Sequence, residues 1–494
     1  MKQHIENLIH YEISKGIITK RDYVYVKNQL YHLLNQSFDD VIYHPNLIIY
    51  PSDALNPILD SLEKDGVLDG SFVSRDLFDA KIMNVFASLP SVVQQMFDEK
   101  FNIAPKHATN FLYNYAKSLN YIRYDRILKN VSYHIDSKFG KLDITINLSK
   151  PEKDPKSILL ESQSVTTSYP KCLLCLENEG FSGNAKKDSR DQHRLIELNL
   201  NEEIWYFQYS PYIYYNEHAI VFSKDHRPMS INEKTFRNLL ALVDNFDGYF
   251  FGSNADLPIV GGSILSHDHY QGGLHHFPIE DAKVIKSWQL HSTTLEMLYW
   301  PLSTIRIKDT NEENLVKLAT NILSIWKQYS NPSIGLYAKT GETPHHTITP
   351  IARKKGETFE MDLILRSNLT TPDFPSGVYH PKPDKWHIKK ENIGLIEAIG
   401  LAILPARLNQ AIKRLRAYYF DNVTLEIGEL IHKDWFDDLS KKHTLTPFNF
   451  DDIIEKEIGL VFEKVLIDCG VFNISNQQTF NDFIEREIYE KLSK

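Results

Sequence analysis

The sequence predicts an α+β fold in which helices flank an antiparallel sheet core and helical regions occupy both ends of the chain. Two observations lead to this prediction. Apolar residues recur at helical spacing through the first 130 residues and again through the last 75. Between these regions, a strand-like run, a helical run and a polar strand-like run follow one another, which favours an α+β core with an antiparallel sheet.

The N-terminal region is expected to be helical. Gly16 offers a stop for the first helix. The apolar positions that define this helix are Ile5, Leu8, Ile9 and Ile13. The same period continues through Tyr23, Val26, Leu30, Leu33 and Leu34. No residue here suggests catalysis, so we interpret this region as a packing or assembly layer.

The central region should carry the sheet. Residues 142–148 alternate apolar and polar side chains, which is typical of a half-buried strand. The apolar run 219–223 indicates a buried strand, and residues 359–365 indicate another. Asn232 is a candidate helix cap. It precedes an apolar helical face made of Phe236, Leu239, Leu240, Val243 and Phe246.

Two further helices are expected toward the C-terminus. Residues 391–404 are interpreted as a buried helix ended by Pro405. Residues 453–467 indicate a second helix, with Gly470 as its C-cap. The chain of 494 residues is then expected to divide into four regions. These are a helical N-terminal region 1–130, a catalytic half 131–300, a second α+β half 301–420 and a helical C-terminal region 421–494.

Composition narrows the function classes. The chain has 55 Lys and Arg against 64 Asp and Glu, and this formal charge of −9 argues against a general nucleic-acid binder. Residues 121–126 interleave aromatic and basic side chains, which suits either base stacking or a solvated helix face. Three cysteines cannot form a disulfide framework and indicate a reducing compartment. Without a signal-peptide core or a long apolar stretch, we expect a cytoplasmic protein with neither nucleic acid nor membrane as partner.

The most informative motif is His267-Asp268-His269-Tyr270-Gln271. Alternate side chains of an extended strand share a face, so the two histidines and the glutamine are expected to point the same way. An unprotonated imidazole can attack phosphorus, and an amide can donate to a phosphoryl oxygen. This favours His269 as a nucleophile and Gln271 as the donor. Two histidines that bind metal or solvate a strand are the alternatives.

A glycine-rich loop precedes this motif. Gly261 and Gly262 add no Cβ, and Ser263 follows them. Backbone N–H groups in such a loop can approach a phosphate closely.

Cys172 and Cys175 form a second motif. Thiolates at this spacing can chelate one zinc ion. A redox pair and two unrelated core cysteines remain open as alternatives. The chain has no second such pair, so histidines would have to complete a zinc site. The candidates are His226, after the 219–223 strand, and His267.

The chain resembles the class II galactose-1-phosphate uridylyltransferases, a bacterial branch of the histidine-triad superfamily. The resemblance spreads over residues 140–410, and the most specific segment is 252–273. The full set of matching segments is 146–155, 169–180, 210–218, 252–273 and 391–408. It implies a histidine-triad-like sheet core, placed in the half 131–300.

The resemblance also implies a ping-pong reaction. UDP-glucose would transfer its uridylyl group to His269 and release glucose 1-phosphate, and galactose 1-phosphate would then accept the group. Gln271 would hold a phosphoryl oxygen, as phosphoryl transfer depends on positioning and charge stabilisation. A histidine-triad hydrolase or phosphorylase, in which water or phosphate resolves the same intermediate, is the alternative. A non-catalytic nucleotide-binding protein is a further hypothesis, and a homodimer is expected by analogy.

The class I enzymes imply further site residues. Their structural zinc site matches Cys172, Cys175, His226 and His267 position by position. Asp268 stands where class I has proline, which makes the local backbone an open question. Candidate substrate-binding residues carried over from the superfamily are Asn216, Asn254, Gly262 and Ser263. Glu397 is similarly matched to a hexose-contacting glutamate.

Overall fold

The computed structural model describes residues 1–39, 41–149, 156 and 167–493. Within these ranges the chain forms two compact units. The first unit comprises Met1–Lys129, Ser149–Ile213 and Glu217–His226, and the second comprises Asn130–Leu148, Tyr214–Asn216 and Arg227–Lys494. Most of the segment 146–155, which contributes to the family resemblance, lies outside the described residues. The four-region division remains a prediction.

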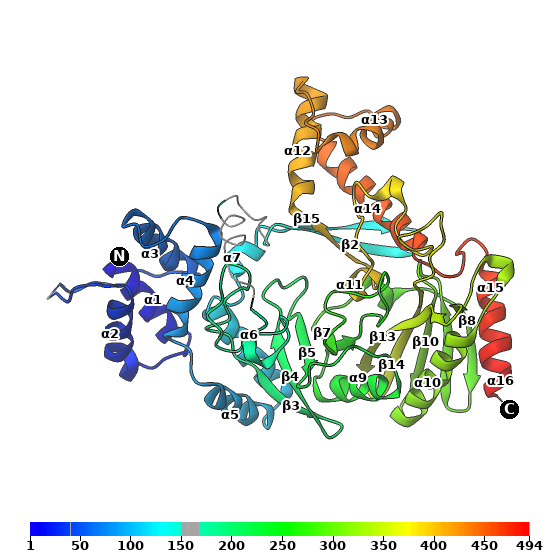
Figure 1. The fold of residues 1–494 in the computed structure, drawn as a ribbon, viewed down its shortest axis with the longest axis horizontal. Coiled ribbons are helices and arrows are strands. Elements are labelled where there is room, and N and C mark those ends of the chain that lie inside the picture. The colour runs from blue at the N-terminus through cyan, green and yellow to red at the C-terminus, as the bar shows by residue number, and fades with distance from the viewer. Residues whose placement is uncertain (40, 150–155, 157–166, 494) are drawn as a thin grey trace. The chain divides into compact units, whose positions relative to one another are not determined.

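The first unit opens with helices, as its apolar periodicity predicts. They are α1 (Lys2–Ser14), α2 (Tyr23–Leu33), α3 (Ser52–Lys64), α4 (Phe72–Asn84), α5 (Pro90–Phe101), α6 (Pro105–Ser118) and α7 (Tyr124–Ile127), with a 3₁₀ turn η1 (Lys20–Asp22) (Figure 1). Ile5, Leu8 and Ile9 of α1 are fully buried and Ile13 is half-buried, and Gly16 follows the helix with a left-handed φ of 72°.

A small antiparallel sheet completes the first unit. Its strands are β3 (Ile196–Leu200), β4 (Glu203–Tyr209) and β5 (Ala219–Ser223), in that order. Phe207 of β4 pairs with Ile196 on one side and Val221 on the other. The predicted strand at 219–223 is confirmed, and its end at Ser223 places His226 three residues beyond the sheet.

The second unit contains a seven-stranded antiparallel sheet. Its strand order is β7 (His269–Gly273), β6 (Phe250–Gly252), β13 (His346–Lys355), β14 (Thr358–Ser367), β10 (Thr304–Asp309), β9 (Thr293–Leu298) and β8 (Val284–Leu290). The helices α9 (Glu233–Asn245) and α10 (Glu312–Gln328) pack against this sheet (Figure 1). Asn232 caps α9, accepting a hydrogen bond from the Lys234 N–H at 2.9 Å. The predicted cap and helix are therefore confirmed.

A second, three-stranded sheet and the C-terminal helices complete this unit. In the sheet, β2 (Gly140–Asn147) lies between β1 (Val131–Ser137), its antiparallel partner, and β15 (Leu401–Pro405), its parallel partner. The helices include α11 (Leu395–Ala398), α12 (Ala406–Asp421), α13 (Lys433–Lys442), α14 (Phe450–Asp468), α15 (Gln477–Asp482) and α16 (Glu490–Leu492), with a π-helical stretch η7 (Phe483–Tyr489) before α16. The short elements are η2 (Leu176–Asn178), η3 (Pro278–Asp281), η4 (Pro332–Ile334), η5 (Pro383–Lys385), η6 (Leu430–His432), β11 (Lys339–Thr340) and β12 (Thr343–Pro344). The α+β class, with an antiparallel sheet and helical ends, is confirmed.

The prediction of one helix over residues 391–404 is wrong. Only the single turn of α11 is helical there, and β15 follows it. Gly400 ends the turn with a φ of 109°, a conformation that suits glycine. The apolar run after it pairs in parallel with β2, with Ala402 opposite Ile144. Such a short apolar run has no polar face, so its period does not distinguish helix from strand.

The C-terminal end of α14 differs in detail from the prediction. The helix extends to Asp468, and Cys469 rather than Gly470 is its C-cap. Gly470 does not adopt a left-handed φ; a Cβ at this position would lie 2.5 Å from the Pro301 carbonyl oxygen. Glycine is required here by close packing.

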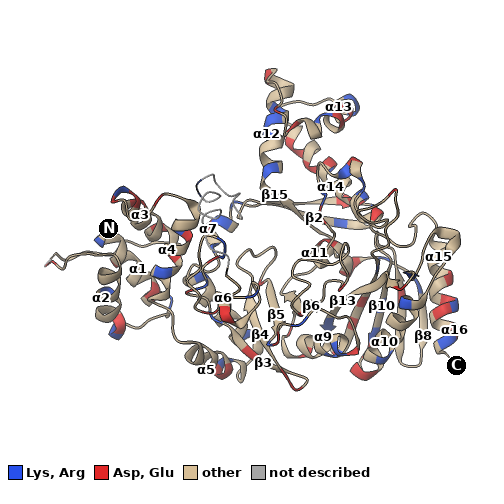
Figure 2. Cartoon of the chain, in the orientation of Figure 1, with Lys and Arg blue, Asp and Glu red and all other residues tan. Residues whose placement is uncertain are grey.

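Charged side chains of both signs are interspersed along the helices of both units (Figure 2). Among the described residues, no helix combines the length and apolar character that a membrane crossing requires.

Candidate functional site

The first unit brings three predicted metal ligands together. Cys172 and Cys175 lie in the turn before η2, and Asn178 secures that turn by donating to both cysteine carbonyls, at 2.7 and 2.9 Å. The Cys172 and Cys175 Sγ atoms are 3.6 Å apart, and the His226 Nδ1 lies 3.7 and 3.2 Å from them. A group of this kind can hold a metal ion.

These spacings match the edges of a tetrahedral zinc site. Zn–S bonds of about 2.3 Å and Zn–N bonds of about 2.0 Å place two sulfurs about 3.8 Å apart and a sulfur and a nitrogen about 3.5 Å apart. A disulfide would require an S–S distance of about 2.0 Å, so the 3.6 Å separation excludes one between these two cysteines. Burial raises the pKa of the Cys172 thiol to about 11, so an ion at this position would have to compensate the cost of a thiolate.

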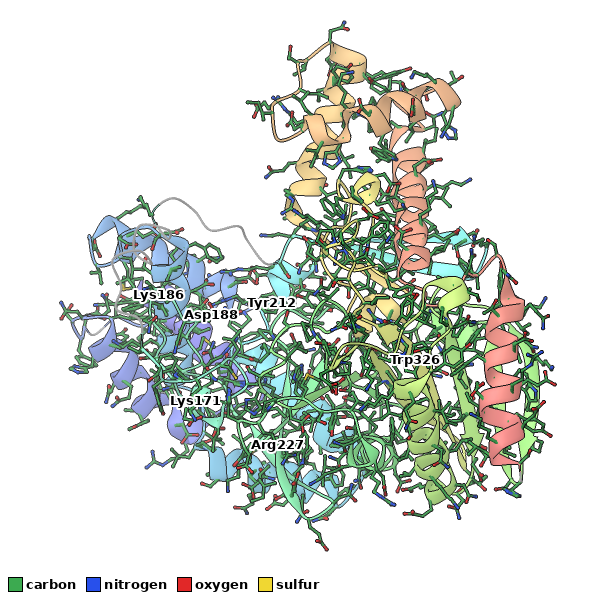
Figure 3. The ribbon with its side chains drawn as sticks, turned by 45° about the vertical axis from the view of Figure 1, so that its right-hand side comes forward. Lys171, Lys186, Asp188, Tyr212, Arg227 and Trp326 are labelled. Carbon is green, nitrogen blue, oxygen red and sulfur yellow. The ribbon has the colours of Figure 1, made fainter. Side chains whose placement is uncertain are left out.

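The second unit holds the histidine motif, but its backbone differs from the prediction. The strand β7 begins at His269, and His267 and Asp268 precede it in non-strand conformation. Arg227, which is labelled in Figure 3, accepts a hydrogen bond from the Asp268 N–H through its carbonyl at 2.7 Å, and its Nε lies 3.3 Å from the Asp268 carboxylate. This double link to Arg227 bends the chain, so an extended conformation over all five motif residues is not observed.

His269 is buried with one ring nitrogen engaged. Its Nδ1 lies 2.8 Å from the His267 carbonyl oxygen. A carbonyl oxygen only accepts hydrogen bonds, so Nδ1 carries the proton and Nε2 retains its lone pair. Burial lowers the pKa of His269 to about 4. The ring is therefore neutral at physiological pH, as a nucleophile must be.

Gln271 lies two residues along β7 from His269, and the two side chains share one face of the strand. The register continues this face across the sheet, because Gln271 pairs with Gly252 and Gly252 pairs with Ile351. Gln271 is half-buried. A phosphate held by its amide would lie on the same side of the sheet as the His269 ring.

The predicted phosphate loop packs on Asn254. Asn254 is 3% exposed and its Oδ1 accepts a hydrogen bond from the Leu395 N–H at 2.8 Å. A Cβ on Gly262 would lie 2.5 Å from the Asn254 Nδ2, so this position requires glycine. Ser263 is exposed, and Ile264 after it has a φ of 62°. A β-branched residue with a left-handed backbone conformation is strained, and such strain concentrates at functional sites.

Asn216 is held near the other end of β7. Its Nδ2 donates to the Leu274 carbonyl at 3.2 Å, while the Tyr215 hydroxyl donates to the Gly272 carbonyl at 3.1 Å. Asn216 is exposed, and its amide oxygen can contact a ligand.

Sequence reasoning did not single out one buried cation of the second unit. Arg366 of β14 is 1% exposed and donates to the Ile393 carbonyl at 2.7 Å. Glu397, matched to a sugar contact by resemblance, is paired with buried Lys389 at 2.8 Å. Nothing in the sequence around Arg366 distinguishes it from other strand arginines, because its partner is a backbone carbonyl.

Two family profiles match the chain. The profile of the galactose-1-phosphate uridyl transferase N-terminal domain matches residues 20–228, and that of the C-terminal domain matches residues 242–437. A protein named galactose-1-phosphate uridylyltransferase from Clostridium perfringens is 44% identical over 96% of each chain. Proteins of the same name are 44% identical in Fusobacterium nucleatum, over 95% of each chain, and 41% identical in Bacillus subtilis, over 98% of this chain and 97% of the relative.

Solved structures give distant matches. Yeast Ap4A phosphorylase is 11% identical, with a TM-score of 0.36 over 77% of this chain and 94% of the other. Its complex with Ap4A aligns with a TM-score of 0.37 over 77% of this chain and 97% of the other, also at 11% identity.

Proposed function

Because the chain belongs to the galactose-1-phosphate uridyl transferase family of nucleotidyltransferases, we propose that it transfers the uridylyl group of UDP-glucose to galactose 1-phosphate. The products are glucose 1-phosphate and UDP-galactose. The exchange follows a ping-pong course through a covalent uridylyl-histidine intermediate. The observation that carries this proposal is the hydrogen bond from His269 to the His267 carbonyl, which leaves Nε2 free to attack.

In the first half-reaction, the His269 Nε2 lone pair attacks the α-phosphorus. The bond from this phosphorus to the bridging oxygen breaks, and glucose 1-phosphate leaves with the electron pair. The ring becomes positively charged, and its Nδ1–H bond to the His267 carbonyl strengthens. A phosphate oxygen of galactose 1-phosphate then attacks the same phosphorus, and His269 leaves as the neutral imidazole. Gln271 donates to a phosphoryl oxygen in both steps.

The remaining site residues have supporting roles. Asn216 contacts the nucleotide, and the backbone at Gly262 and Ser263 contacts phosphate. Asn254 is part of the same site, and its hydrogen bond to the Leu395 N–H suits it to position this loop. A homodimer is part of the proposal by family analogy.

Zinc is the metal that this donor set suits. Cys172, Cys175 and His226 supply two thiolates and one imidazole, and His267 would supply the fourth ligand. A structural zinc ion would then hold the backbone two residues from His269. No reacting group has to bind the metal in this scheme.

Intact-protein mass spectrometry tests the proposal. The enzyme is mixed with UDP-glucose without acceptor and quenched at alkaline pH, since phosphohistidine is acid-labile. We expect a mass gain of one uridylyl group in the wild type and in the control variant His276→Ala, which removes an exposed histidine bonded to Asp281. The gain should be absent in His269→Ala.

Addition of galactose 1-phosphate should then remove the adduct and yield UDP-galactose. An adduct that water or phosphate removes equally fast would support the hydrolase or phosphorylase alternative. Nucleotide binding with neither an adduct nor glucose 1-phosphate release would contradict covalent catalysis.

A further inference from the structure

Arg366 is a buried cation that forms no ion pair with any residue that the structure describes. Its side chain is 1% exposed, and its Nε has no hydrogen-bond partner. Its other contacts are to neutral groups, the Ile393 carbonyl at 2.7 Å and the Thr349 hydroxyl at 3.4 Å. Among the residues that the structure describes, no carboxylate oxygen lies within 4 Å of its nitrogens.

Other buried arginines of the same sheet are paired. Arg306 and Arg353 are 3% and 4% exposed. Both contact Asp362, with Arg306 Nε at 2.6 Å and Arg353 Nη2 at 2.6 Å. Asp362 and Arg366 are four residues apart on β14 and therefore share a face. A buried charge that forms no ion pair is costly, which makes a purely structural role for Arg366 unfavourable.

The register places Arg366 on the face that presents Gln271. Gln271, Gly252, Ile351 and Asp362 are successive partners across four strands, so the side chains of Gln271, Ile351 and Asp362 point to one side of the sheet. Arg366 follows on that side. Gln271, the proposed phosphoryl contact, and Arg366 therefore lie on the same face of the sheet.

Arg366 and Asn254 hold adjacent points of one segment. Arg366 binds the Ile393 carbonyl, and Asn254 binds the Leu395 N–H two residues later. The Gly394 N–H between them donates to Glu397 at 3.2 Å. Asn254 in turn packs on Gly262. The segment is thus fixed to the glycine-rich loop at one end and to Arg366 at the other.

We propose that Arg366 is a positioning residue for the sugar phosphate, acting through the Ile393 carbonyl to hold the segment 389–397 beside the phosphate loop. The proposal rests on the proposed function. Its planar guanidinium reaches the carbonyl and the Thr349 hydroxyl together, which a lysine ammonium cannot do with the same geometry.

Affinity for galactose 1-phosphate, measured by calorimetry, tests the inference without requiring chemistry. Arg366→Lys should weaken binding about tenfold, equivalent to about 1.4 kcal/mol. Arg306→Lys is the matched control, because it makes the same change at a buried arginine of the same face. We expect both variants to lose thermal stability and only Arg366→Lys to lose affinity. In Arg366→Ala, added guanidinium should restore part of the affinity.

The outcomes separate the two proposals. Equal affinity in wild type and Arg366→Lys, or an equal loss in Arg306→Lys, would overturn the positioning role. If Arg366→Lys does not fold, rescue of Arg366→Ala by guanidinium decides the question, and its absence counts against the role. Selective loss of affinity in an enzyme that forms no uridylyl adduct would support Arg366 while contradicting the proposed function. A wild type that binds neither UDP-glucose nor galactose 1-phosphate would contradict both.

Discussion

His269 donates its Nδ1 proton to the backbone carbonyl of His267, two residues earlier, at 2.8 Å. The motif thus orients its own imidazole ring, since the hydrogen-bond acceptor belongs to the same short segment that carries the ring. The link from Arg227 to Asp268 fixes the intervening residue. Because the acceptor is a main-chain atom, the tautomer of His269 does not depend on the identity of the residue 267 side chain.

We predict that the His269 ring is neutral and protonated on Nδ1 at neutral pH. Two-dimensional NMR of protein labelled with ¹⁵N-histidine can show this, with the His269 signals assigned by their loss in His269→Gln. The expected spectrum has a protonated Nδ1 and an unprotonated Nε2. A ring protonated on Nε2 would contradict the proposed direction of attack.

A second prediction concerns metal binding. Purified protein should contain about one zinc ion per chain, and Cys175→Ser should reduce this content to near zero. Cys469→Ser is the matched control, because Cys469 is the buried C-cap residue of α14 and is not one of the predicted metal ligands. Metal content is measured by elemental mass spectrometry.

Thiol labelling gives an independent reading of the same prediction. A chelator should expose Cys172 and Cys175 to a thiol reagent, because the metal would no longer cover their sulfurs. Equal zinc in both serine variants, or labelling that the chelator does not change, would argue against a site at these cysteines.

Residue type and spacing determined how much of the site could be predicted. Two cysteines two residues apart and alternating histidines restrict chemistry strongly, and the family resemblance that they helped to indicate is confirmed by relatives 44% identical over nearly the whole chain. The structure places three of the predicted metal ligands together. Ligand roles and catalytic roles stay predictions.

Contacts made through the backbone could not be predicted. Arg366 binds a carbonyl 27 residues later in the chain, and no side-chain pattern encodes that partner. The same limit explains the wrong helix at 391–404, since only pairing with β2 decides the conformation of Leu401 to Pro405. Tertiary context overrides local preference in such short apolar runs.

A third prediction tests the packing of the glycine-rich loop, for which phosphate binding is predicted. In Gly262→Ala the new methyl group would lie 2.5 Å from the Asn254 amide nitrogen. Asn254 must then shift, and its hydrogen bond to the Leu395 N–H should weaken. We expect kcat/KM to fall about 10- to 100-fold, because small displacements of positioning groups are costly.

Gly428→Ala is the matched control for Gly262→Ala. A Cβ at Gly428 would meet no atom within 4 Å, so activity and thermal stability should stay near the wild type. A normal kcat/KM in Gly262→Ala would show that the Asn254 contact does not position the loop.

The last prediction concerns the buried pair of arginines around Asp362. Burial alone would raise the pKa of this carboxyl, but Arg306 and Arg353 lower it from 3.8 to about 2. The unfolded chain therefore takes up the proton first as pH falls. The resulting stabilisation, about 2 kcal/mol, is fully present above about pH 4 and is lost as pH falls toward about 2.

Asp362→Asn removes this pH-dependent stabilisation and the ion-pair partner of buried Arg306. Arg353 keeps Glu280 at 3.7 Å and Glu360 at 3.5 Å. At pH 7 we expect a loss of about 3–5 kcal/mol in the free energy of unfolding, measured with urea. The difference from wild type should shrink between pH 4 and pH 2.5, since the Asp362 carboxyl is protonated there in the unfolded wild-type chain before it is protonated in the folded one. Glu313→Gln, which removes an exposed partner of Arg237, should change stability little at any pH. A wild-type advantage that stays constant down to pH 2.5 would mean that the paired carboxylate is not the source of the stability.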